Sequence, residues 1–377
     1  MTTNNDDFKC NNSSKIEPSP FSREEWNAFV GESPNGHFFQ SFEFGEIKST
    51  LGWKPIRIVV EDEGGIKAAI SILKIKLPII KSSIFYAPRG PVINFRDREL
   101  LHALLKGVRE AARRENAVFL KIDTGVPVEE RDVVEILKEA GFIIAGRHCD
   151  KLGTQPTTVF RINLQKSLEE IEGRFDKTTR RNIKISGKKG VIVQEDNSKE
   201  GFDAFLLLLM KMVRHKKIAA YDAKYYRDIW EILYPHRMGR LFLARYNGKI
   251  VAGVFVYLFG KKCWLAYSAF DNRYGFVCPN QALHLHVIKW AKEKGCIWYD
   301  LRGTGIVNPD NAQPGKPFYG LYIFKKGFGP EFVRFIPEMD MVFRSGLYKL
   351  WNFSIPLMEM GVRVYANLRR FRCPKKS

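Results

Sequence analysis

Apolar and polar positions alternate along this chain in a pattern that predicts the same structural unit twice. Each unit consists of two paired strands, a third strand, an amphipathic helix and a closing strand that ends at an acidic residue. In the first unit these elements occupy residues 56–60, 66–76, 84–86, 99–114 and 117–122. In the second unit they occupy residues 241–246, 249–259, 263–267, 280–294 and 296–299. We infer an internal duplication that produces an α/β fold with mixed sheets and two similar lobes.

Further helices are predicted around these two units. Ser22 and Glu25 have the spacing of a capping box, and helical patterns also cover residues 43–51, 202–215 and 224–233. The predicted parts of the chain are a flexible tail, a first lobe, a second lobe with a basic connecting segment, and a basic, aromatic helical segment, at residues 1–20, 21–165, 166–345 and 346–377. The last segment is either a packing helix or an interfacial one.

Composition favours a cytoplasmic protein. The 377 residues are 45% apolar, which is enough for two ordinary cores, and no run reaches the roughly 18 uncharged apolar residues that a membrane span requires. The first twenty residues are polar and contain no apolar signal core. Six cysteines are spread along the sequence without a CxxC pair, so we expect neither a disulfide framework nor a metal site.

The net charge of +20 implies a polyanionic partner, which is nucleic acid, a phosphorylated small molecule or an anionic membrane face. Positive charge is densest between the two predicted units, where a basic run includes Arg180, Arg181 and Lys184. This run is either a solvated helix face or a phosphate-binding surface.

Common catalytic and cofactor motifs are missing from the sequence. There is no GxxxxGK[ST], no GxGxxG after a strand and no HExxH. No set of Ser, His and an acid stands out for nucleophilic catalysis. The pyrophosphate loop of acetyl-coenzyme A enzymes is incomplete, and its nearest match, residues 245–248, is better explained as a hairpin turn. No cofactor is therefore expected.

The strongest candidate for a catalytic residue is Lys325, which follows the aromatic run at residues 318–324. We predict that this aromatic run is a strand that delivers Lys325 and Lys326 into a glycine-rich turn. A lysine beside aromatic rings in a partly dry site can stabilise negative charge that develops on a substrate oxygen. The alternative is that Phe324 is a core residue and the lysines lie in a solvated turn.

Six blocks of sequence resemble the FemABX family of aminoacyl-tRNA-dependent transferases, which extend the stem peptide of peptidoglycan precursors and contain two lobes of the GNAT acyltransferase fold. In family order these blocks are FFQSFEFGEIK, GWKPIRIVVEDEGGIKAAISIL, YAPRGPV, RRNIKISGKKGV, YDLRG and LYIFKKGFGPEFVRFI. They extend from about residue 38 to about residue 348. The coiled-coil arm of some members is absent between residues 185 and 202, so the chain resembles the armless type.

The resemblance implies an amide-forming aminoacyltransferase of cell-wall synthesis. Its donor would be aminoacyl-tRNA, and its acceptor would be the stem-peptide amine of a nucleotide-linked or lipid-linked muramyl peptide. A lipid-linked acceptor would bring the protein to the inner face of the membrane as a peripheral protein. The rival interpretations are an N-acyltransferase with another donor or a polysaccharide or lipid-linked amine as acceptor, and a non-enzymatic RNA- or membrane-binding protein.

The resemblance also implies binding roles for individual residues. Lys48 resembles the family lysine that holds the phosphates of the muramyl precursor, and Asp123 resembles an acid that helps to bind it. Either Tyr225 or Tyr226 resembles a tyrosine on the helix that faces the cleft, and the register stays open. A family arginine a few residues before this tyrosine has no clear counterpart, which leaves Arg214 or Lys217 for phosphate binding.

Two further pairs are implicated. Phe324 and Lys325 resemble the Phe-Lys pair beside the transferred acyl group, where the lysine would stabilise the oxyanion. Tyr86 and Arg89, in the block YAPRGPV, are candidates for lining the cleft. The alternative for Arg89 is a shaped turn in which the arginine pairs with a carboxylate.

Overall fold

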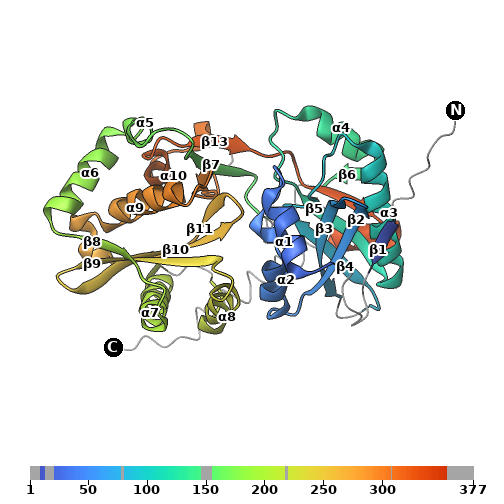
Figure 1. Ribbon diagram of the computed structural model, residues 1–377, viewed down its shortest axis with the longest axis horizontal. Coiled ribbons are helices and arrows are strands. Elements are labelled where there is room, and N and C mark those ends of the chain that lie inside the picture. The colour runs from blue at the N-terminus through green and yellow to red at the C-terminus, as the bar shows by residue number, and fades with distance from the viewer. Residues whose placement is uncertain are drawn as a thin grey trace.

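The structure, a computed structural model, describes residues 9–12, 21–77, 80–145, 155–216, 220–306 and 308–354 and contains two lobes, each built on a seven-stranded mixed sheet (Figure 1). In spatial order, the strands of the first sheet are β1 (Lys9–Asn12), β2 (Lys54–Asp62), β3 (Gly65–Lys76), β4 (Ser83–Pro88), β5 (Ala117–Asp123), β14 (Met339–Val342) and β6 (Phe142–Ile144). In the corresponding order, those of the second sheet are β8 (Ile192–Glu195), β9 (Gly239–Tyr246), β10 (Lys249–Phe259), β11 (Lys262–Phe270), β12 (Trp298–Asp300), β7 (Thr158–Asn163) and β13 (Glu331–Arg334).

The two sheets repeat one topology, which confirms the predicted α/β fold of two similar lobes. Neighbouring strands in each sheet are antiparallel except for one parallel pair, β4 with β5 and β11 with β12. The helix between the parallel strands is α3 (Arg98–Arg114) in the first lobe and α9 (Pro279–Glu293) in the second. Such a crossover is necessary because a tight hairpin cannot join parallel strands.

One strand of each sheet comes from the other half of the chain. β7 follows β6 in sequence, but it lies between β12 and β13 of the second sheet. β14 follows β13, but it lies between β5 and β6 of the first sheet. The lobes therefore exchange equivalent strands. The predicted boundary at residue 165 places β7 in the first lobe, and the predicted range 166–345 places β14 in the second, whereas strand pairing assigns each to the other lobe.

Helices cover the sheets and fill the space between the lobes (Figure 1). Toward the N-terminus, α1 (Arg23–Glu32) begins with the predicted capping box of Ser22 and Glu25. The remaining helices before β8 are η1 (Phe38–Gln40), α2 (Phe42–Ser49), α4 (Arg131–Glu139), α5 (Leu168–Gly173) and α6 (Lys177–Lys188). The later ones are α7 (Lys199–Lys216), α8 (Ala223–Leu233), η3 (Asn272–Val277), η4 (Pro309–Asn311) and α10 (Tyr319–Lys326). Among the described helices, none combines the length and apolarity needed to cross a bilayer.

The connection from α6 to α7 is short and contains only β8. Residues 155–216 are all described, and no coiled-coil arm extends from this segment, as predicted.

An apolar cluster joins the lobes. It brings Trp26 and Phe38 from the N-terminal helices together with Phe205 of α7, Tyr225 of α8 and Tyr257 of β10. The rings of Phe38 and Tyr257 stack with centroids 4.0 Å apart. Because buried aromatic side chains contribute large amounts of hydrophobic stabilisation, this cluster holds the lobes in one relative position.

The aromatic run before Lys325 is a helix, so the strand predicted at residues 318–324 is wrong. Phe318 has a left-handed φ of 65° and begins α10, which extends to Lys326. Tyr322 and Lys325 are buried, while Leu321 and Ile323 are exposed. This burial has the spacing of a helix, and the nearly continuous run of apolar residues concealed that period in the sequence.

Regular secondary structure is also present near both ends of the chain. Lys9–Asn12, within the predicted flexible tail, pairs with β2 as strand β1. Residues 345–354 are helical, and Tyr348 packs against Phe119 with ring centroids 5.3 Å apart. The first turns of the C-terminal segment are therefore a packing helix. The rest of that segment, residues 355–377, lies outside the described residues.

The exchanged strand β14 carries a buried ion pair that makes a stability prediction possible. Asp340 accepts hydrogen bonds from Lys121 of β5 and from the Tyr348 hydroxyl, both at 2.8 Å. We expect Asp340→Ala to lower the free energy of unfolding by about 3 kcal/mol, because the buried Lys121 charge loses its nearer carboxylate. Urea denaturation measures this change. Asp203→Ala, which removes an exposed partner of Lys199, should cost at most about 1 kcal/mol; equal losses would contradict the prediction.

Candidate active site

A narrow crevice lies between the two lobes. Its lining includes Phe39 and Arg89 of the first lobe, and Arg161, Asp300 and Arg302 of the second. Its free volume is about 10 Å³, close to the space of a single water molecule. Charges here are poorly hydrated, so their interactions with one another and with a bound substrate are stronger than in open solvent.

Asp123 ends β5 at the edge of this crevice, as the sequence predicted. Its carboxylate accepts hydrogen bonds from the Tyr86 hydroxyl and the Arg89 backbone N–H, both at 2.6 Å, and from the Gln155 backbone N–H at 3.1 Å. Burial, with Asp123 as the next cause, raises the pKa of Tyr86 well above its usual value. Tyr86 therefore stays protonated and holds the carboxylate in place.

Arg89 is buried and lines the crevice. Its backbone adopts a left-handed φ of 56°, and its guanidinium donates to the carbonyls of Thr124, at 3.2 Å, and Pro156, at 2.5 Å. The guanidinium also lies 4.4 Å from the centre of the Phe335 ring. Its side-chain partners are therefore carbonyls and a ring rather than the carboxylate that the alternative interpretation called for.

Arg302 connects Asp123 with the predicted catalytic lysine. Its guanidinium donates to the Gln155 side-chain carbonyl at 2.7 Å, and the Gln155 backbone binds Asp123. On the other side, the Lys325 ammonium donates to the backbone carbonyls of Gly303, at 2.8 Å, and Arg302, at 3.3 Å. Asp123, Gln155, Arg302 and Lys325 thus form a continuous set of contacts across the two lobes.

Lys325 is buried, with 4% of its surface exposed. Burial is the main reason that its pKa falls to about 7; nearby Asp300 opposes this shift, and Arg302 adds to it. Phe324 lies beside it and packs against His284, with ring centroids 5.3 Å apart. The pKa of His284 is lowered to about 3, first by burial and then by Lys325, so this imidazole is neutral. Near neutral pH, a lysine in this environment is close to the balance between its charged and neutral forms.

Lys48 and Tyr225 meet at the second predicted part of the site. The Lys48 ammonium lies 3.4 Å from the Tyr225 hydroxyl and 5.7 Å from the centre of the Tyr221 ring. Burial and the charge of Arg302 lower the pKa of Lys48 to about 8. Tyr226, by contrast, packs edge-on against Tyr267. Of the two candidate tyrosines, Tyr225 is therefore the one beside Lys48.

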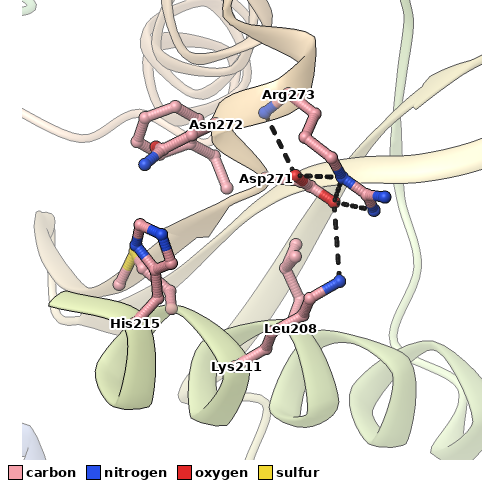
Figure 2. Close-up of a pocket in the computed structure, with 8 residues that line it drawn as sticks. Leu208, Lys211, His215, Asp271, Asn272 and Arg273 are labelled. Carbon is pink, nitrogen blue, oxygen red and sulfur yellow. Dashed lines mark hydrogen bonds and ion pairs between the residues drawn. The ribbon is translucent and has the colours of Figure 1, made fainter. Parts of the chain in front are cut away.

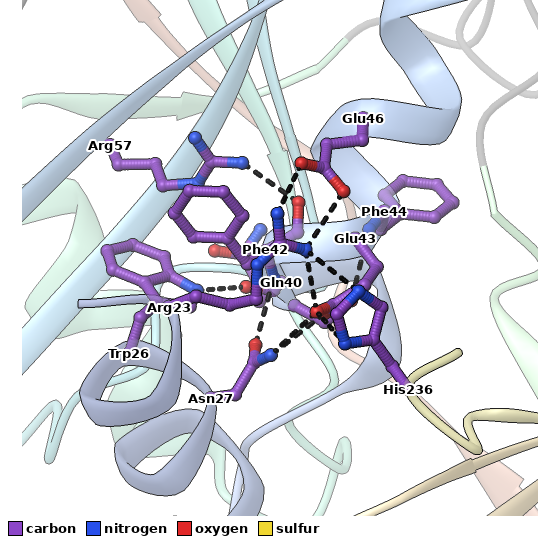
Figure 3. A network of polar contacts seen from close by, with 11 residues as sticks. Arg23, Trp26, Asn27, Gln40, Phe42, Glu43, Phe44, Glu46, Arg57 and His236 are labelled. Carbon is purple, nitrogen blue, oxygen red and sulfur yellow. Dashed lines mark hydrogen bonds and ion pairs between the residues drawn. The ribbon is translucent and has the colours of Figure 1, made fainter. Parts of the chain in front are cut away.

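A buried polar network fixes the helix that carries Lys48 (Figure 3). Gln40, at its centre, donates to the carbonyls of Ser71 and Pro88 and accepts from the Ser71 backbone N–H, so it anchors η1 to β3 and β4. Buried Glu43 of α2 accepts from Arg23 and Asn27 of α1. Gln40 and Glu43 are buried, so leaving their hydrogen bonds unmade would be costly. These hydrogen bonds therefore fix the orientation of α2.

The basic run falls on the exposed surface of α6. Arg180, Arg181 and Lys184 are all exposed there. The start of this helix adjoins the turn after Lys325, since the Asp176 backbone N–H donates to the Gly327 carbonyl at 2.8 Å. The helix that carries this patch therefore begins beside the predicted catalytic region.

Arg214 lies apart from the crevice, on the exposed side of α7. It lines a hollow beside a pocket of about 200 Å³. Figure 2 shows the residues that line this pocket, which come from α7, the end of β11 and the start of η3. In that pocket Asp271 is bonded to Arg273 and Lys211, so its charge is already compensated. The structure does not bring Arg214 to Lys48, and Lys217 lies outside the described residues.

Sequence reasoning missed two residues that connect the site. Arg302 belongs to the block YDLRG, which contributed to the family resemblance without a role for its arginine. Its backbone N–H binds Asp300 at 2.6 Å, much as the Arg89 N–H binds Asp123. Arg302 stands two residues after Asp300, so the acid that ends the closing strand of the second unit was a usable signal for it. Gln155 had none, because only tertiary structure brings its loop to Asp123.

Comparison with known proteins assigns the chain to a family. The chain matches the FemAB family over residues 21–249 and 239–354. It is 24% identical over 425 residues to a lipid II:glycine glycyltransferase of Staphylococcus aureus (strain MRSA252), covering 94% of this chain and all of the relative. It is 26% identical over 402 residues to the protein of that name from Staphylococcus haemolyticus (strain JCSC1435), covering 89% and 95%.

Solved structures support the fold. A crystal structure of FemX superposes with a TM-score of 0.82 at 24% identity, covering 88% of this chain and 98% of that one. The structure of L-PGS from Bacillus licheniformis has a TM-score of 0.52 at 13% identity, covering 88% and 94%. The prediction of an amide-forming acyltransferase is confirmed by the glycyltransferase relatives. Since the family match spans almost the whole described chain, this protein belongs to the FemAB family.

Proposed function

We propose that this protein transfers an aminoacyl group from aminoacyl-tRNA to the stem-peptide amine of a lipid-linked muramyl peptide. The observation that carries this proposal is the contact series Asp123, Gln155, Arg302 and Lys325, which joins the predicted acceptor-binding acid to a buried lysine. The acceptor class follows the relatives, which are named for glycine transfer to lipid II.

The donor ester is already activated, so the protein needs to position the two substrates and stabilise the oxyanion. The acceptor nitrogen attacks the ester carbonyl, the C–N bond forms, and the tetrahedral intermediate expels the ribose oxygen of the tRNA. The Lys325 ammonium stabilises the oxyanion while its carbonyl partners hold it in place. The proton lost by the amine ends on the leaving oxygen or in solvent.

The two substrates contact different parts of the protein. Phosphates of the acceptor bind Lys48, with Tyr225 beside it. The tRNA lies on α6, where Arg180, Arg181 and Lys184 meet its backbone, because this helix begins next to the turn that follows Lys325. Since α6 and α2 lie on different lobes, donor and acceptor approach from different sides (Figure 1).

The direct test is transfer of label from a mixed pool of aminoacyl-tRNAs to a detergent-solubilised, lipid-linked muramyl pentapeptide. Transfer that disappears after RNase treatment supports the proposal. Turnover that is independent of tRNA would favour an N-acyltransferase with another donor. Absence of transfer to this acceptor and to its nucleotide-linked counterpart, with folded protein, would overturn the assigned reaction.

Replacement of Lys325 tests the oxyanion role. Lys325→Met should lower kcat by about 100- to 1,000-fold, because one preorganised charge at the oxyanion is lost, while the Kd for the acceptor stays within about threefold. Single-turnover kinetics and acceptor titration measure the two quantities. Lys326→Met is the matched control, since the neighbouring lysine is exposed, and it should retain activity. Equal losses of kcat and acceptor affinity in Lys325→Met would contradict the role.

The pH dependence distinguishes a charged lysine from a general base. The pKa of Lys325 in the free enzyme is about 7, so the ammonium loses its charge as pH rises through this value. The part of kcat/KM that depends on the positive charge should be lost over the same pH range. Lys325→Arg keeps its charge. The ratio of wild-type to Lys325→Arg kcat/KM, in which ionisation of the acceptor amine cancels, should therefore fall above about pH 7. A ratio that rises through pH 7 would make neutral Lys325 a base.

Lys48 should act on binding. Lys48→Met keeps the apolar stem and removes the charge, so the Kd for the lipid-linked acceptor should rise about 10- to 100-fold, with kcat within about threefold. Because the pKa of Lys48 is about 8, wild-type affinity should also weaken above that pH, and the variant should lose this dependence. Fluorescence titration measures both effects, with Lys106→Met, an exposed lysine of α3, as control. A large loss of kcat at saturating acceptor would refute this division of roles.

A further inference from the structure

An exposed apolar surface remains at one end of the first lobe. The helical residues 345–354 pack one side against this lobe, where Leu347 and Trp351 join the small apolar cluster of Ile75 and Leu77. The opposite side presents Leu350 and Phe353 to solvent, with 60% and 72% of their surfaces exposed. Large apolar side chains this exposed at neighbouring positions of one helix are typical of a contact surface.

Two other segments extend this surface. Ile80 and Lys81, in the connection between β3 and β4, are exposed. They are tied to the helical segment because the Arg344 guanidinium donates to the Ser82 hydroxyl at 3.0 Å. The end of α3 joins them, since the Ser83 hydroxyl donates to the Glu115 carbonyl at 2.8 Å. These hydrogen bonds bring the three segments together into one surface.

Positive charge surrounds the apolar side chains. The exposed cations of these segments are Lys76, Lys81, Arg113, Arg114, Arg344 and Lys349. Within the same described segments, the acid is Glu115, and its carboxylate is already ion-paired with Lys74. Projecting apolar groups among uncompensated cations are complementary to an anionic bilayer, where the apolar groups enter the interface and the cations contact lipid phosphates.

The surface lies at the same end of the first sheet as Lys48. The Trp53 backbone N–H donates to the Lys48 carbonyl at 3.2 Å, and Lys54, the next residue, begins β2 opposite Lys74. Lys76 is two residues further along β3. Pro88, which precedes the crevice residue Arg89, and Asp123 lie at the opposite ends of β4 and β5. Contact with a membrane at this end would therefore leave the crevice and α6 open to the aqueous side.

We propose that this surface, formed by Ile80, Leu350 and Phe353 with their surrounding cations, docks the protein on the anionic face of a lipid bilayer. Docking brings Lys48 to the level at which the phosphates of a lipid-linked acceptor lie. This second point rests on the proposed function, whereas attachment to the bilayer does not depend on it.

Vesicle flotation tests the docking with the full chain. Wild-type protein should float with vesicles of phosphatidylglycerol and phosphatidylcholine and much less with phosphatidylcholine alone. The double variant Leu350→Ser/Phe353→Ser and the triple variant Lys76→Gln/Lys81→Gln/Lys349→Gln should each bind about tenfold more weakly or worse. Equal binding of wild type to both kinds of vesicle, or unchanged binding of either variant, would overturn the proposal.

Matched controls separate this surface from general charge and hydrophobicity. Ile192→Ser/Leu207→Ser removes side chains that are 58% and 73% exposed on the second lobe. Lys138→Gln/Lys199→Gln/Lys224→Gln removes the same charge from other exposed helices. Both should float like wild type, and losses as large as those of the test variants would overturn the proposal.

Two further readouts complete the test. Leu350→Ser/Phe353→Ser should keep the wild-type Tm; a lower Tm with unchanged flotation would mean that residues 355–377 of the chain cover the surface, which overturns the proposal. With detergent-solubilised acceptor, the test variants should transfer at the wild-type rate, and with vesicle-embedded acceptor they should be slower. If wild type transfers in neither format but floats as expected, the proposed function fails and the docking surface stands.

Discussion

The reciprocal exchange of β7 and β14 is the constraint on which the rest of the structure depends. Each seven-stranded sheet is complete only with a strand from the other half of the chain. Removal of either strand would leave two open sheet edges inside a lobe, with unpaired backbone groups on both sides. The lobes therefore cannot separate as two independent domains. A crevice between them can hold groups from both halves at fixed distances, which a flexible linker would not achieve.

The exchange also determines which residues meet in the crevice. Arg161 reaches Asp300 because β7 pairs with β12, and Trp298 lies beneath its guanidinium. The loop before β7 carries Gln155 to Asp123 of the first lobe and to Arg302 of the second. Had β7 remained in the first sheet, these contacts between lobes would have no structural basis. The connection between Asp123 and Lys325 is thus a consequence of topology.

Much of the fold could be predicted from the sequence because its signals are local. Period-two alternation and the Asn247-Gly248 turn define hairpins, and the Ser22 and Glu25 capping box marks a helix start. Strand exchange could not be predicted in this way, because the sequences of β7 and β14 do not specify the strands with which they pair. Each could form backbone hydrogen bonds with any neighbouring strand that has suitable apolar faces. Similarly, the aromatic run before Lys325 has no clear period, and only burial on one side shows that it is helical.

Prediction of the site was limited for a different reason. Lys48 and Lys325 stand in blocks that resemble a family, and Asp123 and Tyr225 lie outside those blocks. The resemblance suggested a role for each of them, and the structure adds the neighbours on which those roles depend. The low pKa of Lys325 comes mainly from burial beneath residues distant in sequence. The register between Tyr225 and Tyr226 likewise depends on how α8 packs against α2.

The electrostatics of the crevice follow from combining burial with an excess of cations. His37 is buried, and its pKa lies well below the usual value because of burial and, next, the nearby charges of Arg89, Arg302, Arg161 and Lys262. Such a group of cations with few acids is unfavourable in an empty, poorly hydrated site. In the proposed function, an anionic substrate or a developing oxyanion would relieve this repulsion, and the relief would contribute to binding and to stabilisation of the transition state. The exchanged strands and the apolar interlobe cluster hold these cations together despite their mutual repulsion.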